Sequence, residues 1–334
     1  MFDILTLQKE LSAIALPSGF EGVTAEHLKK LAGPFCDEMV IDPLGSLICH
    51  KKGEGEKIML CAHMDVIGFM VTYIDEKGCL RFEPIGGHTT AFLHRTPVRL
   101  ENGLKGVIMC EKWAEESKKN MADIPVSAFY IDIGAGSYEK AKELVQIGDV
   151  AVFDSGTYSQ NGCVITNYAD DLVACIVLLK TMESLKESPY DLYFVFTVQE
   201  ERGLYGAMTS AYTIHPDMGI ALDVCGTGDT PSETAYCDVK LGMGPTVKVR
   251  DASLICNPQV VEFLRKGAEK AGVPYQNEII LSGGTDAGAI QRTHGGILSG
   301  VVSIPTRHVH SPAEIYSLSD VENAVKLLLG ALEK

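Results

Sequence analysis

The chain has 334 residues, and 46% of them are hydrophobic. A chain of this size can bury a large core, and its length favours one big domain with a smaller one. Acidic residues outnumber basic ones by 44 to 29, which gives a formal net charge of −15. This charge repels nucleic acid and anionic membranes, so we expect neither as a partner.

Cysteine usage and hydropathy favour a reducing compartment. None of the ten cysteines forms a C-x-x-C pair. Several lie in apolar runs, which favours buried free thiols: Cys49, Cys61, Cys79, Cys110 and Cys175. The segment MFDILTLQKEL lacks the features of a secretory leader, and no apolar run reaches the roughly 20 residues of a membrane helix. We therefore expect a cytoplasmic protein.

The N-terminal region predicts helices followed by strands. Residues 3–16 carry apolar side chains at helical spacing, and PSGFEG ends this pattern before a second predicted helix at 23–32. Residues 40–51 and 57–65 are apolar, short and bounded by glycine or polar residues, as strands are.

Residues 68–160 have a different pattern, with hairpin-like alternation and turns at 75–78 and 101–103. Within this stretch, residues 128–144 predict a strand, a glycine turn and a helix that has Ser137 as its N-cap. We expect a β-rich, barrel-like insert.

Beyond Cys163, helices and strands alternate up to a final helix at 319–333. This alternation predicts an α/β fold with a mixed sheet sandwiched by helices. Candidate metal ligands occur on both sides of the insert. The simplest division is a discontinuous catalytic domain, 1–67 and 161–334, interrupted by the insert at 68–160.

Five residues with metal-binding side chains each stand where an apolar strand is predicted to end: His63, Asp170, Glu201, Asp223 and His310. Parallel sheets present their chemistry at strand ends, so these side chains can converge. Two imidazoles and three carboxylates suit zinc, cobalt or manganese, and a shared carboxylate can hold two ions close together. The pattern indicates a two-metal hydrolytic centre and hence an enzyme.

Residues beside these donors leave alternatives open. Asp65 points to the same side of a strand as His63, so it could orient the imidazole, although His63 could instead be a loop residue that caps the strand. Glu200 and Glu201 diverge, so one could bind metal while the other takes a proton from water; a solvated acidic turn is the alternative.

Helix capping alone would explain Asp170 and Asp171, which precede an apolar helix. Asp223 ends a strongly apolar strand, where a metal or a buried hydrogen bond would compensate its charge. His308 and His310 are two residues apart, so both could face the same side, and their spacing does not show which one is the metal ligand.

Several weaker signals concern substrate and nucleotide binding. Arg307 could grip a substrate carboxylate. Asp286 lies in the glycine-rich segment 283–290, which we expect to form a tight turn lining the site, and it is a second candidate substrate contact. That segment lacks the lysine of a phosphate loop, and the turn at 134–139 lacks the third glycine of a dinucleotide fingerprint.

A set of longer motifs runs in order along nearly the whole chain: PSGFEG, AHMDVIGFMV, DIGAGS, VQEERGLYGA, ALDV, GGTDAGAI and PTRHVHSPAE. In these motifs the chain resembles the tetrahedral aminopeptidases, also called the glutamyl aminopeptidase family or metallopeptidase family forty-two. Members have also been labelled cellulases or endoglucanases.

The resemblance implies a peptidase that removes N-terminal residues from peptides, with two divalent ions per subunit, zinc being the first expectation. His63 and Asp223 would hold one ion, Glu201 and His310 the other, and Asp170 would bridge them.

The same resemblance implies that Glu200 is the general base and that Asp65 orients His63. It further implies that the insert is a dimerisation domain and that dimers build a hollow dodecamer.

Three departures from the family pattern lie beside the proposed ligands. Leu172 stands where Arg is common, Arg202 where a small apolar residue is usual, and His308 where Tyr is frequent. They bear on substrate preference and assembly more than on metal binding. The rival hypotheses are an N-acyl amino acid deacylase or carboxypeptidase, a metal-free glycoside hydrolase with two opposed carboxylates, and a non-catalytic scaffold.

Overall fold

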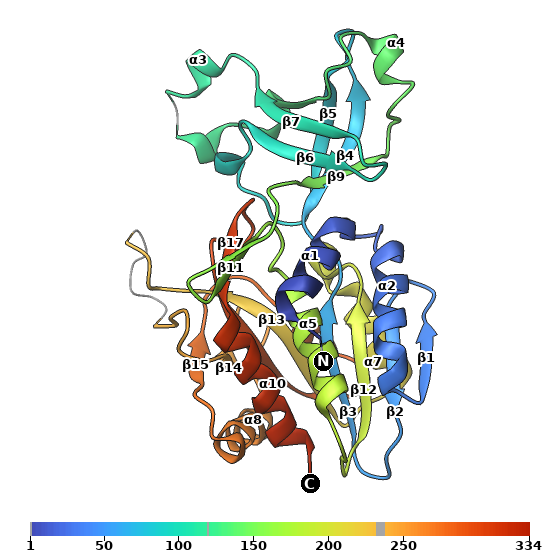
Figure 1. Cartoon of the computed structure of the whole chain (residues 1–334), viewed down its shortest axis with the longest axis vertical. Helices are drawn as coiled ribbons and strands as arrows, with labels where there is room; N and C mark the ends of the chain where they lie inside the picture. Colours follow the sequence, from blue (N-terminus) through green and yellow to red (C-terminus); the bar gives the residue numbers. More distant parts are fainter. Residues whose placement is uncertain (1, 119, 232–237) are drawn as a thin grey trace.

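The computed structural model describes residues 2–118, 120–231 and 238–334. Figure 1 shows two parts: a layered α/β body that contains both chain ends, and a small β-barrel at its top. The barrel is formed by an internal stretch of the chain, drawn in blue to green, and the red C-terminal helix returns to the layered body.

The layered body is built on one mixed sheet of eleven strands. Its main path runs β1-β2-β12-β3-β13-β16-β17-β11-β10, with β14 paired to β16 and β15 to β14. The strands are β1 Glu38–Ile41, β2 Leu47–Lys51, β3 Lys57–His63, β10 Tyr158–Gln160, β11 Cys163–Thr166, β12 Asp191–Thr197, β13 Met218–Gly226, β14 Thr246–Arg250, β15 Gln276–Ile279, β16 Leu298–Arg307 and β17 Glu314–Ser317.

The central strands β12, β3, β13 and β16 pair in parallel. Their sequences are nearly continuous apolar runs because helices cover both faces of the sheet, and β3 is buried from Ile58 to His63. In register, His63 stands beside Thr197, and Asp223 stands beside Ser303. The carboxyl ends of these parallel strands therefore meet at one edge of the sheet.

Two glycines show that helices cover both faces of the sheet. A Cβ at Gly219 would meet Ile290 of α9, and a Cβ at Gly300 would meet Val260 of α8. Gly219 pairs with Ser299, so Gly219 and Gly300 face opposite sides, and α8 and α9 do too. α10 packs on α8 and α5, and α7 packs on α9. The helices of this body are α1 Ile4–Ile14, α2 Gly22–Ala32, α5 Leu172–Ser184, α6 Glu200–Gly203, α7 Tyr205–Ile214, α8 Pro258–Ala271, α9 Asp286–Ile290 and α10 Leu318–Leu332.

The second part is a closed barrel with the strand order β4-β5-β8-β7-β6-β9. Its strands are β4 Gly68–Ile74, β5 Leu80–Ile85, β6 Thr96–Leu100, β7 Lys105–Cys110, β8 Phe129–Asp132 and β9 Val150–Phe153, with short helices α3 Trp113–Glu116 and α4 Tyr138–Ala141. Ser137 caps α4, as predicted. The predicted fold class, a mixed sheet between helices with a barrel-like insert, is confirmed.

Some details differ from the sequence predictions. The glycine-rich segment 283–290 is not a turn throughout, because Asp286–Ile290 forms α9. Strand β10, at the end of the predicted insert, pairs with β11 in the main sheet, so the proposed boundary at 160 falls within a hairpin. The domain boundaries stay a prediction.

The cysteine and membrane predictions can be compared with the described residues. Cys49, Cys61 and Cys175 are buried free thiols, Cys110 is buried, and Cys79 is half-buried. Among the residues that the structure describes, no helix is both long and apolar enough to span a bilayer.

Candidate metal centre

The five predicted donors come from five separate segments at one end of the sheet. His63 ends β3, Asp170 lies between β11 and α5, and Glu201 lies in α6 just after β12. His310 follows β16. Asp223 lies within β13 instead of after it, because β13 continues its pairing with β16 up to Gly226.

These side chains converge on Asp170. Asp170 Oδ1 is 3.1 Å from His63 Nε2, and Asp170 Oδ2 is 3.2 Å from His310 Nε2. Glu201 Oε1 is 3.1 Å from the same His310 nitrogen. Asp223 belongs to the group around His63, in which one donor atom per residue lies within 4.8 Å of every other. The two oxygens of the Asp170 carboxylate thus face two different imidazoles.

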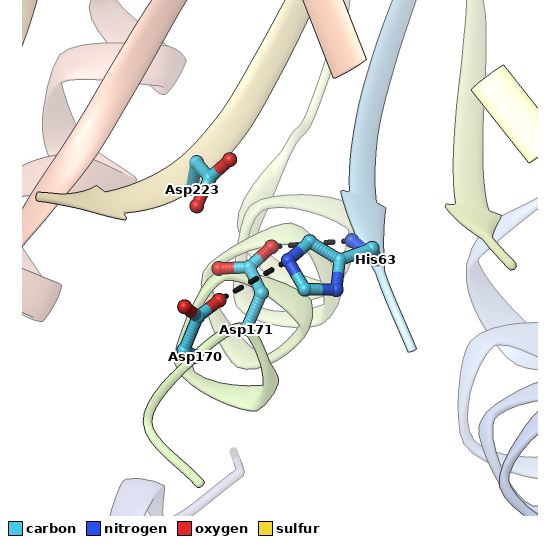
Figure 2. A group of neighbouring side chains, drawn as sticks. All are labelled: His63, Asp170, Asp171 and Asp223. Carbon is cyan, nitrogen blue, oxygen red and sulfur yellow. Dashed lines mark hydrogen bonds and ion pairs between the residues drawn. The ribbon is translucent and has the colours of Figure 1, made fainter. Parts of the chain in front are cut away.

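Figure 2 shows Asp170, Asp171 and Asp223 gathered around the His63 imidazole. Asp171, which sequence reasoning treated as a capping residue, is fully buried, and its Oδ2 accepts a hydrogen bond from the His63 backbone N–H at 3.1 Å. Its other oxygen, Oδ1, has no hydrogen-bond partner among the described residues. Asp171 is therefore a further acidic group of this cluster.

Asp65 supports two segments of the site. His63 Nδ1 lies 3.0 Å from the Asp65 carbonyl oxygen and 3.6 Å from its carboxylate. The Asp65 carboxylate accepts hydrogen bonds from the backbone N–H groups of Glu200 and Glu201, each at 3.0 Å, and from Ser18 Oγ at 2.7 Å. Asp65 thus holds the turn that carries both glutamates.

The donor geometry fits a divalent cation. With Nδ1 donating to the Asp65 carbonyl, a neutral His63 presents the lone pair of Nε2 to Asp170 Oδ1, a buried oxygen with no hydrogen-bond partner in the part of the chain that the structure describes. Two acceptors about 3 to 3.5 Å apart match adjacent ligands of one tetrahedral ion with bonds of about 2.1 Å. In this tautomer His63 and Asp170 present two acceptors that cannot hydrogen-bond to each other, whereas both can bind one divalent cation.

The electrostatics of the cluster support the same conclusion. Burial raises the pKa of Glu200 well above its usual range, and burial together with Asp170 raises the pKa of Asp223 to about 8. Burial would lower the pKa of His310, but hydrogen bonds to Asp170 and Glu201 raise it to about 12. Glu200 and Asp223 tend to keep protons because they are buried beside other carboxyls, whereas for Asp170 the contacts with His310 and His63 outweigh burial and lower the pKa. A divalent cation would stabilise the charged forms of all three.

The donors line a cavity of about 500 Å³. Its wall also includes Arg202, Lys248 and the glycines Gly283 and Gly284. The two predicted substrate contacts are not brought into it. The Arg307 guanidinium binds the Asp229 carboxylate with Nε and Nη2 at 3.0 and 2.7 Å. Asp286 is 3% exposed and accepts a hydrogen bond from Thr197 Oγ1 at 2.6 Å.

Sequence reasoning missed two buried carboxylates behind the site. Glu21 Oε1 accepts hydrogen bonds from the backbone N–H groups of Gly19 and Gln199, at 2.9 and 3.0 Å. Glu314 binds the backbone at Asp170 and His310. The available signal was an acidic residue inside PSGFEG and PTRHVHSPAE, the same motifs that carry the resemblance.

Comparison with known sequences agrees with this site. A sequence model described as M42 glutamyl aminopeptidase matches residues 45–327. A protein of Acetivibrio thermocellus is 46% identical over 332 residues, which cover 99% of this chain and 98% of that protein. The lysyl aminopeptidase of Pyrococcus furiosus is 34% identical, with 95% of this chain and 91% of its own length covered.

Comparison with solved structures gives the same fold. The aminopeptidase of Desulfurococcus kamchatkensis has a TM-score of 0.95 at 36% identity, covering 99% of this chain and 94% of its own. The TET1 peptidase of Pyrococcus horikoshii, which can assemble into a tetrahedron or a large octahedral shell, has a TM-score of 0.89 at 33% identity, covering 99% and 100%. A Thermotoga maritima protein solved as an endoglucanase has a TM-score of 0.82 at 31% identity, covering 98% and 96%.

Proposed function

Since the chain belongs to the M42 glutamyl aminopeptidase family and is thus a peptide-bond hydrolase, we propose that it removes N-terminal residues from peptides with the help of two divalent metal ions. The observation that carries this proposal is the convergence of five separate segments on one cavity, with Asp170 facing His63 and His310. Mixed nitrogen and oxygen donors suit zinc first, and cobalt or manganese as alternatives.

The proposed ligand sets follow from the two sides of Asp170. His63 and Asp223 would hold one ion, Glu201 and His310 would hold the other, and Asp170 would bridge them. The separate contacts of Asp170 Oδ1 and Oδ2 with the two imidazoles support this division. When bound, such ions polarise a scissile carbonyl and lower the pKa of water.

Glu200 is the proposed general base, which takes a proton from the attacking water and returns it to the leaving amine. It lines the cavity, its Oε2 lies 3.9 Å from His63 Nε2, and its backbone is fixed by Asp65. Burial raises the pKa of its carboxyl, which favours a group that can hold a proton between the two transfers.

The substrate proposal is a peptide with a free amino terminus. The second ion could bind the lone pair of an unprotonated terminal amine, which an acylated nitrogen does not offer because its lone pair is delocalised into the acyl carbonyl. This preference separates an aminopeptidase from an N-acyl amino acid deacylase.

The test uses metal-free protein reloaded with Zn²⁺, Co²⁺ or Mn²⁺ and assayed on aminoacyl p-nitroanilides, on free peptides and on the same peptides with an acetylated N-terminus. We expect no cleavage without metal, recovery on reloading, and cleavage of the unblocked peptides alone. Preferred cleavage of the acetylated forms would favour the deacylase. Cleavage of a sugar polymer that persists with a chelator would favour the glycoside hydrolase.

We further propose that the chain forms a homo-oligomer through the barrel. The assembly of the related TET1 peptidase into closed shells supports this. Dimers that build a dodecamer are the form expected from the resemblance, and a cytoplasmic location stays a prediction.

A further inference from the structure

Glu314 is a buried carboxylate behind the proposed metal centre. It begins β17, is 1% exposed and does not line the cavity. Both of its oxygens accept hydrogen bonds from backbone N–H groups: Oε1 from His310 at 2.8 Å, and Oε2 from Ala169 at 2.6 Å and Asp170 at 3.0 Å. No contact of its carboxylate with a proposed ligand's side chain is present among the described residues.

These bonds connect two segments that are distant in sequence. Asp170 and Glu314 are 144 positions apart, and Glu314 is brought beside the Asp170 segment because β17 pairs with β11, with Glu314 opposite Thr166. The same carboxylate reaches the backbone of His310, four residues before it. One rigid group thus sets the separation of two backbones whose side chains meet at 3.2 Å.

The backbone at His310 needs such support. Its φ is +60°, in the left-handed region that residues other than glycine rarely adopt. A conformation of this kind persists where surrounding contacts determine it. The hydrogen bond from His310 N–H to Glu314 is one such contact.

We infer that Glu314 is a positioning residue that fixes Asp170 and His310 at the spacing required by one ion, the one proposed to be held by Glu201 and His310. This inference rests on the proposed two-metal function. Asp65 has the matching role on the other side, where its carboxylate holds the backbone of Glu200 and Glu201.

The test is a Co²⁺ titration of metal-free wild-type protein and of Glu314→Gln, followed by calorimetry and visible absorption. Glutamine keeps the size of the side chain but has one accepting oxygen, so it cannot accept the backbone hydrogen bonds of both segments. We expect the wild type to bind two Co²⁺ ions. In the variant, at least the ion proposed to be held by Glu201 and His310 should bind about 10- to 100-fold more weakly, the usual effect of losing a group that orients ligands.

Activity gives a second readout. Saturating Co²⁺ should restore turnover in Glu314→Gln, because its ligands and base are intact, and should not restore it in Glu200→Gln. If the wild type binds no Co²⁺, the proposed function fails. If the wild type binds two ions and Glu314→Gln binds each of them as tightly as the wild type does, the positioning role fails and the proposed function stands.

Asp320→Asn is the matched control. Like Glu314, Asp320 is buried, does not line the cavity and accepts backbone N–H groups, in this case the two of Gly242 and Gly244 at 2.7 and 2.8 Å. We expect this variant to lose stability and to keep both Co²⁺ affinities. Glu314→Asp, which is too short to span both segments, decides the matter if the glutamine variant does not fold. If both Glu314 variants fail to fold while the control folds, Glu314 is a folding residue and the inference is overturned.

Discussion

The turn that carries Glu200 donates backbone hydrogen bonds to two buried carboxylates. Asp65 accepts the N–H groups of Glu200 and Glu201, and Glu21 accepts that of Gln199. Gln199 itself has a φ of +56°. Because the backbone is fixed on both sides of Glu200, its carboxylate is kept at the cavity wall, with Oε2 3.9 Å from His63 Nε2.

Glu200→Gln tests the proposed base directly. The substitution keeps the size of the side chain and the backbone hydrogen bond to Asp65, but it removes the proton acceptor. We expect kcat to fall by about two to four orders of magnitude, the usual contribution of general base catalysis, with little change in metal content. Steady-state kinetics and metal analysis measure the two effects, and unchanged kcat would refute the role.

Glu21 should make the stability of the metal-free protein depend on pH. Burial and the charge of Asp65 raise the pKa of Glu21 from 4.5 to about 7. The folded state then binds the proton more tightly than the unfolded state, so this contribution is fully present below pH 4.5 and is lost as the pH rises through 7. Wild type should lose roughly 2 to 3 kcal/mol more than Glu21→Gln over that range.

The glutamine variant is a close control because its amide oxygen can still accept the Gly19 and Gln199 N–H groups. Chemical denaturation of both metal-free proteins at pH 4.5, 6 and 7.5 measures the difference. Parallel stability curves would mean that Glu21 does not titrate in this range.

At the residue scale, sequence predicted the donors because each interrupts or follows an apolar run. It could not predict Glu21 or Glu314, since a carboxylate that accepts backbone N–H groups across the fold has no periodic signal. Sequence could not reveal that Arg307 pairs with Asp229, 78 positions away; its contact with substrate stays a prediction.

At the scale of elements, α8 and α10 cross at two glycines. A Cβ on Gly330 would lie 2.2 Å from the Gly267 carbonyl oxygen, and one on Gly267 would lie 2.8 Å from the Leu327 carbonyl oxygen. The helix backbones are therefore in close contact, and a side chain at either position would push the helices apart.

Gly330→Ala should destabilise the protein by roughly 1 to 3 kcal/mol, because the cost of overpacking against a backbone exceeds the gain in helix propensity. Gly22→Ala in α2 is the matched control, since a Cβ there meets nothing within 4 Å. It should be neutral or slightly stabilising. Thermal unfolding of the two variants compares them, and equal melting temperatures would contradict the close crossing.

Long apolar elements were predictable, and short polar ones were not. The helix after Asp171 was predicted because residues 172–184 are largely apolar. β15 has the sequence QNEI, and four residues of mixed polarity carry too little pattern to identify a strand. Its pairing with β14 comes from the tertiary structure.

At the scale of the whole molecule, the hairpin-like alternation in the insert predicted a barrel, but the sequence alone did not reveal that β10 pairs with the main sheet. The barrel has apolar side chains on its surface, including Tyr73, Leu144 and Ile147, which are 56%, 47% and 67% exposed.

Ile147→Asp should weaken assembly, because it places a charge on the barrel surface that is proposed to be buried between copies. Light scattering coupled to size exclusion should then report a smaller particle than for the wild type. Val23→Asp on α2, at a side chain that is 58% exposed, is the control and should leave the particle unchanged. An unchanged mass for Ile147→Asp with a reduced mass for the control would place the interface on the layered body.

The order of the donors along the chain has a consequence for biosynthesis. The first proposed ligand is residue 63, the last is residue 310, and the carboxylate inferred to position Asp170 and His310 is residue 314. A nascent polypeptide in which residues 310–314 are still inside the ribosome lacks part of the proposed catalyst, so we expect it not to trim neighbouring peptides. Hydrolytic activity should begin only after these residues have emerged and joined the earlier segments.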